Sequence, residues 1–171
     1  MEDIKKDKNE FLKGKSIALI GPMGAGKTTV GKALSKLLFL PFIDTDELIE
    51  KKYGKITDIF ANHGEKIFRE YETEIIKTLN GQAIISTGGG VVLNVENMKI
   101  LKKSSIIVFL DRKLKYIKKT IGKDNMRPLA SDIEKIYLQR RVLYETYADI
   151  HIKINAYPKK IAEHIIKLIK K

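Results

Sequence analysis

The sequence contains no cysteine and no tryptophan, and only four of its 171 residues are proline. Without cysteine, the chain can form neither disulfides nor a thiolate metal site. Its three histidines, His63, His151 and His164, are too scattered to suggest a zinc site. No apolar run approaches the roughly 18 residues that span a bilayer, and the charged N-terminus does not resemble a signal peptide. These absences predict a cytoplasmic protein without a membrane partner, and any metal should be Mg²⁺ bound by oxygen.

The chain is basic, because 33 Lys and Arg residues against 21 Asp and Glu residues give a net charge of +12. Such a balance suits a nucleic-acid binder, and it equally suits an enzyme that gathers anionic substrates. The lysines are spread over predicted helix faces without interleaved aromatic residues, which is typical of a solvated surface. Composition therefore favours a protein without a nucleic-acid partner, and the length fits one well-buried domain.

Residues 21–28 read GPMGAGKT and match the phosphate-binding pattern G-x-x-x-x-G-K-[ST] at every fixed position. The match directly follows the apolar run 16–20 and precedes apolar residues at helical spacing, so it lies between a strand and a helix. Backbone N–H groups, the positive end of that helix and the Lys27 ammonium can surround phosphates, while the Thr28 hydroxyl can ligate Mg²⁺. The residues predicted to bind the nucleotide here are Gly24, Ala25, Gly26, Lys27, Thr28 and Thr29. We expect the chain to bind a nucleoside triphosphate.

Short apolar runs alternate with helical patterns along the rest of the chain. The expected strands are 16–20, 41–43, 83–86, 105–110 and 149–154, and the expected helices are 27–39, helices within 46–80, 95–102, 113–121, 132–146 and 158–170. Strands separated by helices predict an α/β fold with a parallel sheet and helices on both faces. We expect a charged, mobile extension over residues 1–13 and a single domain over 14–171, with its substrate-binding region at about 44–80.

The final helical pattern, 158–170, carries isoleucines on one side and lysines on the other. A basic amphipathic helix can bind a membrane surface. Packing of the apolar side onto the sheet is the commoner outcome, and we expect it here.

Polar clusters follow two of the predicted strands, at the edge where open α/β sheets bind ligands, and a third lies on a helix. Asp44 and Asp46 can hold a Mg²⁺-bound water and accept a proton, although Asp46 also fits a helix N-cap. The Gly88–Gly90 run lets backbone N–H groups pass against a ligand, although a plain flexible loop has the same composition. Arg69 offers a fork to a carboxylate or phosphate with Glu72 as its orienter, although a surface ion pair has the same spacing.

A polar, proline-containing stretch at about 122–132 separates two helical patterns, and we expect it to form a lid over the phosphates. Arg127 in this stretch can deliver a guanidinium to a transferring phosphoryl group. Arg140, on the next helix, is a candidate second anion ligand. Each is a common surface residue when taken alone, and the order of the clusters along the chain is what singles them out.

Six motifs in that order make the sequence similar to the shikimate kinase family from about Lys15 to the end. They are the phosphate loop at 21–28, the D-[ST]-D of residues 44–46, the F-R-x-x-E of 68–72, the G-G-G of 88–90, the R-P-L of 127–129 and the R-x-x-L-Y of 140–144. The resemblance implies a three-layer α/β fold of the nucleoside-monophosphate-kinase type, with a five-stranded parallel sheet in the order 2-3-1-4-5 and a mobile lid. It also implies transfer of the ATP γ-phosphoryl group to the 3-hydroxyl of shikimate, on the route to chorismate and aromatic amino acids.

The resemblance also implies roles for individual residues. Lys27 would contact the β- and γ-phosphates, Thr28 the Mg²⁺, and Asp44 the water shell of the metal. Asp46 would bind the ring hydroxyls and act as base or orienter for the attacking one. The shikimate carboxylate and ring would be held by Arg69, Gly89, Gly90 and Arg140. Arg127 would stabilise charge on the transferring group, which makes Lys27, Asp46 and Arg127 the catalytic set.

Other positions match the supporting residues of the family. Phe60 and Phe68 resemble its ring-packing aromatics, Ile56 the apolar wall beside them, and Glu72 the orienter of Arg69. The sequence departs from the family in two places. The segment from Arg127 to Arg140 is shorter than in many members, and Lys118 and Lys119 stand where members often carry an arginine that stacks on adenine. Lys119 and Pro158 would then form the two sides of the adenine slot.

Other functions fit part of the same pattern. A kinase of the same fold could act on gluconate or on a nucleoside monophosphate, but the acidic pair with Arg69, Arg140 and the glycine run favours a small polyhydroxylated acid. The net charge of +12 also suits a nucleotide- or nucleic-acid-binding module without turnover. We expect shikimate and ATP as substrates, a monomer, and no nucleic-acid or membrane partner.

Overall fold

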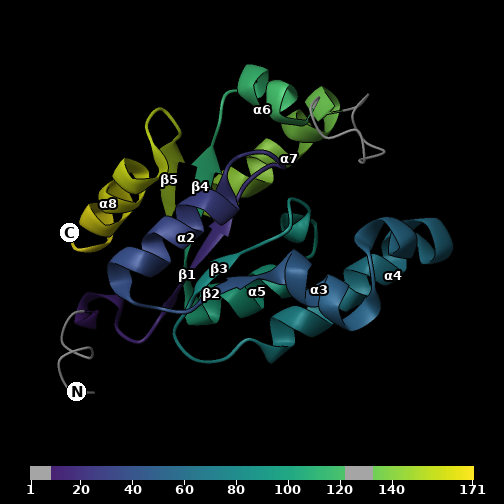
Figure 1. Cartoon of the computed structure of the whole chain (residues 1–171), viewed down its shortest axis with the longest axis horizontal. Helices are drawn as coiled ribbons and strands as arrows, with labels where there is room; N and C mark the ends of the chain where they lie inside the picture. Colours follow the sequence, from purple (N-terminus) through teal and green to yellow (C-terminus); the bar gives the residue numbers. More distant parts are fainter. Residues whose placement is uncertain (1–8, 122–132) are drawn as a thin grey trace.

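Five strands form the centre of the fold, and all of their pairings are parallel. They are β1 (Ser16–Ile20), β2 (Phe42–Asp44), β3 (Ile84–Ser86), β4 (Ser105–Asp111) and β5 (Ile150–Lys153). Their order is β2-β3-β1-β4-β5, which confirms the predicted sheet. The computed structural model describes residues 9–121 and 133–171, so the predicted lid and Arg127 lie outside the described residues (Figure 1).

The central strand β1 is buried along its whole length. Its Ile17 aligns with Ile84 of β3 on one side and with Ile106 of β4 on the other. A parallel strand covered on both faces reads as a continuous apolar run, because neither row of its side chains meets water. The SIALI sequence of β1 therefore follows from its place in the sheet.

Seven α-helices and two short 3₁₀ turns surround the sheet in the described part of the chain. The helices are α2 (Lys27–Leu38), α3 (Thr45–Tyr53), α4 (Ile56–Thr78), α5 (Val95–Ser104), α6 (Leu114–Ile121), α7 (Ile133–Tyr147) and α8 (Pro158–Ile169), and the turns are η1 (Glu10–Leu12) and η2 (Val91–Leu93). The helical region predicted within 46–80 is divided into α3 and α4, and α4 is kinked at Gly64, where φ is 78°. The two 3₁₀ turns were not predicted, because three residues are too few to show a periodicity.

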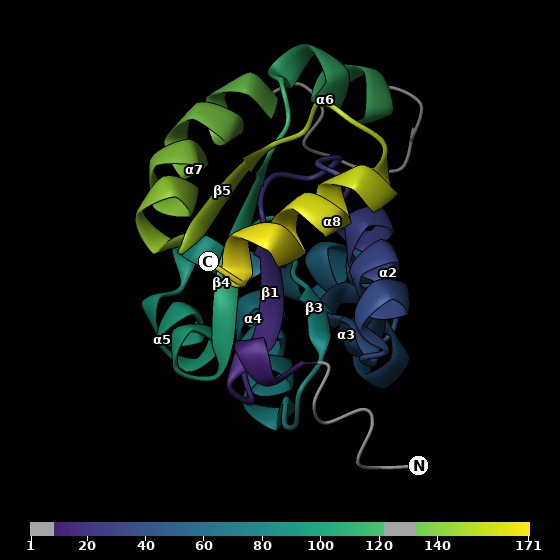
Figure 2. The same cartoon turned by 90° about the vertical axis from the view of Figure 1, so that its left-hand side faces the viewer.

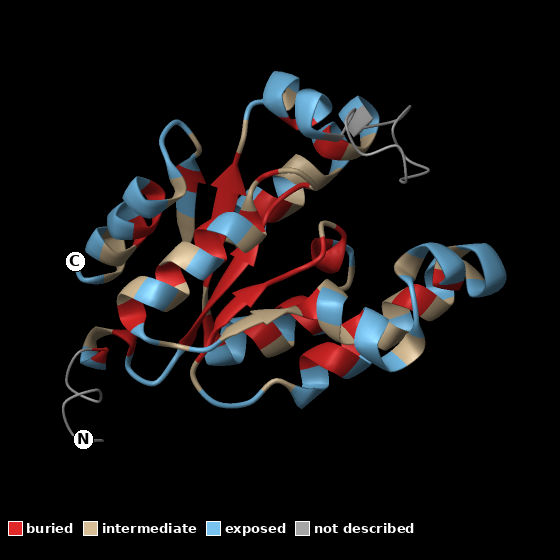
Figure 3. Ribbon diagram, viewed as in Figure 1, coloured by how far each residue is buried: buried red, intermediate tan, exposed pale blue. Residues whose placement is uncertain are grey.

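Helices cover both faces of the sheet, and the alternation along β1 shows which core each face belongs to (Figures 1 and 2). Ile17 and Leu19 pack with residues of α2 and α8, whereas Ala18 and Ile20 pack with residues of α4, α5 and α7. The central strands are buried along most of their length, whereas the helices carry buried and exposed residues in turn (Figure 3).

The apolar side of α8 lies in the core, as predicted. Ile161, Ala162 and Ile165 are each at most 3% exposed and belong to the cluster that includes Leu34 of α2. The lysines lie on the opposite, exposed side of the helix. The amphipathic pattern is thus accounted for by packing on α2, and a membrane surface is not needed to explain it.

Residues 9–12, which the sequence analysis assigns to the N-terminal extension, pack against the domain. Leu12 is 1% exposed, and the Asn9 side-chain amide donates to the Leu38 carbonyl at 2.8 Å.

Among the described residues, the helices are too short or too polar to cross a membrane.

We predict that Gly21→Ala destabilises the protein more than Gly14→Ala does. Gly21 has φ 143°, and an added Cβ would lie 2.8 Å from the backbone oxygen of Leu110, which cannot rotate away. Gly14 also has positive φ, at 76°, but an added Cβ would meet nothing within 4 Å. Both variants carry the strain of positive φ, so the further loss for Gly21→Ala comes from the clash, and its free energy of unfolding should fall by about 1–3 kcal/mol more, the usual cost of overpacking. Urea unfolding of the two variants measures this difference, and equal losses would contradict the close approach.

Candidate active site

The phosphate loop follows β1 and ends at α2, as the motif predicts. Gly26 is the N-cap of α2 with φ 93°, and it has no side chain to occupy the N–H groups of the first helical turn. Lys27 is 8% exposed, and its Nζ donates to the carbonyls of Gly21 at 2.7 Å and Pro22 at 2.9 Å. The ammonium is thus held against the inside of the loop, beside the positive end of a helix. This arrangement fits a polyphosphate.

Asp44 and Asp46 come from the junction of β2 and α3. The Thr28 hydroxyl donates to Asp44 Oδ2 at 3.0 Å, and Asp44 Oδ1 accepts from the Asp46 backbone N–H at 3.1 Å. Asp44, and not Asp46, is therefore the N-cap of α3, which corrects the N-cap alternative raised for Asp46. The Thr28–Asp44 pair brings two oxygen ligands together at the start of α2, as a Mg²⁺ site next to phosphates requires.

The Gly88–Gly90 turn after β3 lies against three parts of the site. A Cβ atom added at Gly88 would lie 2.8 Å from Asp46 Oδ1 and 3.1 Å from Glu72 Oε1. One added at Gly89 would lie 3.2 Å from the Met23 backbone nitrogen of the phosphate loop. One added at Gly90 would lie 2.1 Å from Arg69 Nη2. The glycines therefore allow close backbone approach here, and the alternative of a plain flexible loop is not needed.

Arg69 lies on α4 and is held by two carboxylates. Its Nη1 donates to both oxygens of Glu72 at 3.2 and 3.0 Å, and its Nη2 donates to Glu65 Oε1 at 3.0 Å. Glu72 is fully buried, whereas the Glu65 side chain is 58% exposed. The Asn97 amide of α5 donates to Glu72 Oε2 at 3.4 Å. The pair is thus part of a buried polar network, and the alternative of a simple surface ion pair is wrong.

Burial raises the pKa of Glu72 above its ordinary value of 4.5, and the charge of Asp46 adds to the rise. The charges of Arg69 and Arg140 act in the opposite direction, by favouring the ionised carboxylate. Asp46, Arg69 and Arg140 thus all lie close enough to Glu72 to change its pKa. The site therefore combines two arginines with two carboxylates, which suits an anionic ligand that also carries hydroxyl groups.

Helix α7 brings Arg140 to the same place. Tyr144, one helical turn after Arg140, is fully buried, and its hydroxyl donates to the Gly89 carbonyl. Burial raises the pKa of Tyr144 to about 12, although the nearby charges of Arg140 and Arg69 lower it. The Tyr144 hydroxyl thus stays protonated and joins α7 to the glycine turn, with both arginines close by.

Arg112 lies on the side of the site where adenine is expected, and no sequence motif pointed to it. Arg112 directly follows β4, and its Nη1 donates to the Gly24 carbonyl at 2.7 Å and to the Thr120 hydroxyl at 3.2 Å. Its position after a strand at the ligand-binding edge was the signal that could have identified it. Lys119 is exposed on α6, and the half-buried Pro158 begins α8. No hydrogen bond or ion pair of the described residues joins these two.

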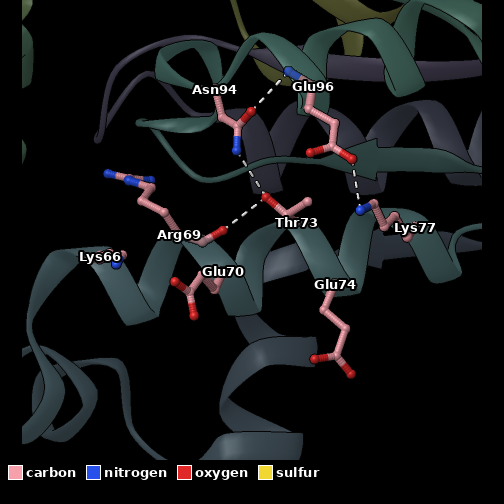
Figure 4. Close-up of a pocket in the computed structure, with 8 residues that line it drawn as sticks. All are labelled: Lys66, Arg69, Glu70, Thr73, Glu74, Lys77, Asn94 and Glu96. Atoms are coloured by element: carbon pink, nitrogen blue, oxygen red, sulfur yellow. Dashed lines mark hydrogen bonds and ion pairs between the residues drawn. The ribbon is translucent and has the colours of Figure 1, made fainter.

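A pocket lined by polar and charged residues lies beside the site, between α4 and the start of α5 (Figure 4). Its lining residues are Lys66, Arg69, Glu70, Thr73, Glu74, Lys77, Asn94 and Glu96. Thr73 donates to the Arg69 carbonyl at 2.9 Å and accepts from the Asn94 amide at 3.0 Å, so the pocket wall ties α4 to α5. The pocket shares only Arg69 with the residues described above, and it carries both signs of charge. It is distinct from the phosphate loop.

We predict that the wild type loses stability relative to Glu72→Gln as the pH rises above 4.5, the ordinary pKa of Glu72. Because folding raises this pKa, the protonated Glu72 side chain stabilises the folded state in full below pH 4.5. This stabilisation is lost as the pH rises through the raised pKa. The difference in unfolding free energy should change by up to about 1.4 kcal/mol per pH unit in that window.

Thermal melts of both proteins between acidic and neutral pH measure that difference. Glu70→Gln is the matched control, since it removes an exposed carboxylate from the same helix. A wild type that gains stability over Glu72→Gln as the pH rises would contradict the burial of an unfavourable charge.

Comparison with known proteins connects this geometry to one family. The family model described as shikimate kinase matches residues 23–170. The shikimate kinase of Bacillus mycoides is 46% identical over 145 residues, which cover 81% of this chain and 87% of that protein. The shikimate kinase of Sulfurihydrogenibium is 42% identical over 164 residues, which cover 92% of this chain and 99% of that protein.

Solved structures agree with the sequence comparison. The shikimate kinase from Acinetobacter baumannii, in complex with shikimate, superimposes with a TM-score of 0.87 at 33% identity, covering 95% of this chain and 96% of that one. The shikimate kinase from Aquifex aeolicus gives a TM-score of 0.78 at 34% identity, covering 89% and 94% of the two chains.

Proposed function

The chain belongs to the shikimate kinase family, and we propose that its described residues divide the reaction of that family between two adjoining sites. The reaction transfers the γ-phosphoryl group of ATP to the 3-hydroxyl of shikimate. A bond forms between the hydroxyl oxygen and the γ-phosphorus, the bridge to the β-phosphate breaks, and the hydroxyl proton is released. The products are shikimate 3-phosphate and ADP.

The phosphate loop serves the nucleotide. The ATP phosphates lie against the loop from Gly24 to Thr29, where Lys27 compensates the negative charge that moves toward the β-phosphate during transfer. Lys119 and Pro158 border the adenine. Arg127 remains the proposed donor of positive charge to the transferring group.

Mg²⁺ fits the oxygens of Thr28 and Asp44, which lie 3.0 Å apart at the start of α2. Thr28 would bind it directly and Asp44 through water, as is usual for this ion beside phosphates. When bound, the ion supplies positive charge to the phosphate oxygens.

The shikimate site adjoins the loop across the glycine turn. Arg69 and Arg140 bind the carboxylate, Gly89 and Gly90 lie against the ring, and Asp46 accepts or orients the proton of the attacking hydroxyl. One observation carries this assignment: the Gly88–Gly90 backbone approaches Asp46, Arg69 and the phosphate loop at once. An acid and a triphosphate bound on its two sides lie next to each other, as transfer requires.

We also expect the protein to act as a cytoplasmic monomer without a nucleic-acid or membrane partner. A panel of shikimate, quinate, gluconate and nucleoside monophosphates in an ADP-release assay tests the substrate. Shikimate should be phosphorylated preferentially, and preferential turnover of gluconate or of a nucleotide would overturn the proposal.

Lys27→Ala should remove nearly all turnover. Loss of one such charge contact to phosphate typically lowers kcat by about 10²-fold or more. The measurement is kcat by ADP release, and a thermal melt reports folding. Lys36→Ala, at an exposed position on the same helix, is the control and should leave kcat unchanged. A Lys27→Ala variant with more than about a tenth of wild-type kcat would overturn the role of the loop.

The acid-binding role of Arg69 and Arg140 predicts a difference between shikimate and its neutral methyl ester. Each arginine changed to alanine should weaken binding of the acid by about 1.5–3 kcal/mol, or roughly 10- to 150-fold, and binding of the ester much less. Asp46→Asn should instead lower kcat with both compounds, since it alters the partner of the attacking hydroxyl.

Titration of acid and ester against wild type and the three variants separates these effects. Lys66→Ala serves as the control, because Lys66 is an exposed cation one turn before Arg69. If acid and ester lose the same affinity at both arginine sites, neither arginine binds the carboxylate.

A further inference from the structure

A second carboxylate–arginine pair lies at the carboxyl end of β4, outside the residues assigned above. Asp111 Oδ1 accepts from Arg141 Nη1 at 2.9 Å and from the Tyr137 hydroxyl at 3.1 Å. Asp111 Oδ2 accepts from Arg141 Nη2 at 2.8 Å and lies 3.0 Å from His151 Nε2. The strand end is thus joined to α7 by a two-pronged ion pair and to β5 by the histidine.

This pair is partly withdrawn from water, because Asp111 is 9% exposed and the Arg141 side chain 31%. Burial by itself raises the pKa of Asp111, but the hydrogen bonds from Arg141 and His151 lower it below the ordinary value. The carboxylate therefore stays charged. Two parallel hydrogen bonds to a guanidinium fix its orientation as well as its position, unlike a single contact on an exposed surface.

Most of the N–H groups of Arg141 are engaged by protein groups. Besides the contacts with Asp111, its Nε lies 3.0 Å from Glu145 Oε1, and its Nη1 donates to the Tyr137 hydroxyl. A guanidinium with these partners has little capacity left for a ligand. Any role of Arg141 in ligand binding must therefore come from the part of the protein that it holds in place.

Arg141 holds helix α7, which also carries Arg140. Tyr137, Arg141 and Tyr144 are spaced i, i+4 and i+7, so they share the side of α7 that faces β4. Tyr144 stacks on Phe109 of β4, with ring centroids 5.2 Å apart. Asp111 lies two residues beyond Phe109 on the same strand. The helix is therefore fixed to β4 at two points one turn apart, Arg141 and Tyr144, and Arg140 directly precedes the first of them.

We propose that the Asp111–Arg141 ion pair is a positioning device that sets the rotation of α7 and so aims Arg140 at the carboxylate of the acid substrate. This inference rests on the proposed carboxylate-binding role of Arg140. Tyr144 alone fixes one point of the helix, and a second fixed point is needed to stop rotation about the helix axis. A binding side chain must be held to within a fraction of an ångström for full affinity, and neighbouring groups that hold it usually supply this.

The test measures shikimate and ADP dissociation constants by calorimetry for the wild type and for Arg140→Ala, Asp111→Asn, Arg141→Lys and His151→Gln. Asp111→Asn should raise the shikimate Kd about tenfold, the lower end of the loss seen when groups that orient metal-binding side chains are removed. The ADP Kd should stay within about twofold, because the phosphate loop is untouched. Shikimate KM should rise more than kcat falls.

Arg141→Lys keeps the charge but not the fork, so it should fall between wild type and Asp111→Asn, and it provides a second variant if the latter is unstable. His151→Gln is the comparison variant, because His151 contacts the same carboxylate from β5 and stacks on Phe109 without contacting α7 through a hydrogen bond of the described residues, and it should change the shikimate Kd much less than Asp111→Asn does. Asp111→Asn added to Arg140→Ala should cost nothing further, because the pair acts through Arg140.

Additive losses in the double variant, a parallel rise of the ADP Kd, or an equal effect of His151→Gln would overturn the inference and make the pair merely structural. An unchanged shikimate Kd in Asp111→Asn, with a weakened Arg140→Ala, would overturn the inference alone. An unchanged Kd in Arg140→Ala would instead overturn the proposed role of Arg140, and the inference with it.

Discussion

The missing side chains of Gly88–Gly90 are the constraint on which the rest of the site depends. Only a backbone without Cβ atoms can lie this close to Arg69 Nη2, to Asp46 Oδ1 and to the phosphate loop at the same time. The neighbours differ in what they can do about a clash. The guanidinium of Arg69 is the end of a flexible chain and would move, whereas the Met23 backbone would not. A methyl group added at Gly90 would therefore move the Arg69 guanidinium before it changed the fold.

The sequence predicts which parts of the candidate site lie together where their placement follows directly from the chain. A phosphate loop has fixed local spacing, and the carboxyl ends of parallel strands share one edge, so Lys27, Asp44 and the glycine turn were predictable together. The sheet order followed from the resemblance, and its strands fell within a residue of their predicted bounds. The helical spacing of apolar residues in α8 correctly predicted which side of that helix packs into the core.

Contacts that join distant residues could not be predicted in this way. Asn97 meets Glu72 across 25 positions, and Arg112 meets Gly24 across 88. No local periodicity encodes either, because each depends on which elements pack side by side. The cost of ionising a side chain could not be predicted either. In the sequence, Glu72 looks like an exposed ion-pair partner at i+3 from Arg69, and only its complete burial in the structure shows that its ionisation is costly.

Burial of two carboxylates accounts for the paired charge in and beside the proposed acid site. Glu72 and Asp111 are both withdrawn from water, and each forms a hydrogen-bonded pair with an arginine. Such pairs add little to folding, since the cost of desolvation offsets most of the attraction. They do fix side chains that would otherwise lose rotamer freedom when a ligand binds. If Arg69 and Arg140 bind the substrate carboxylate as proposed, the cost of ordering these side chains is met during folding, which leaves more of that interaction to appear as affinity.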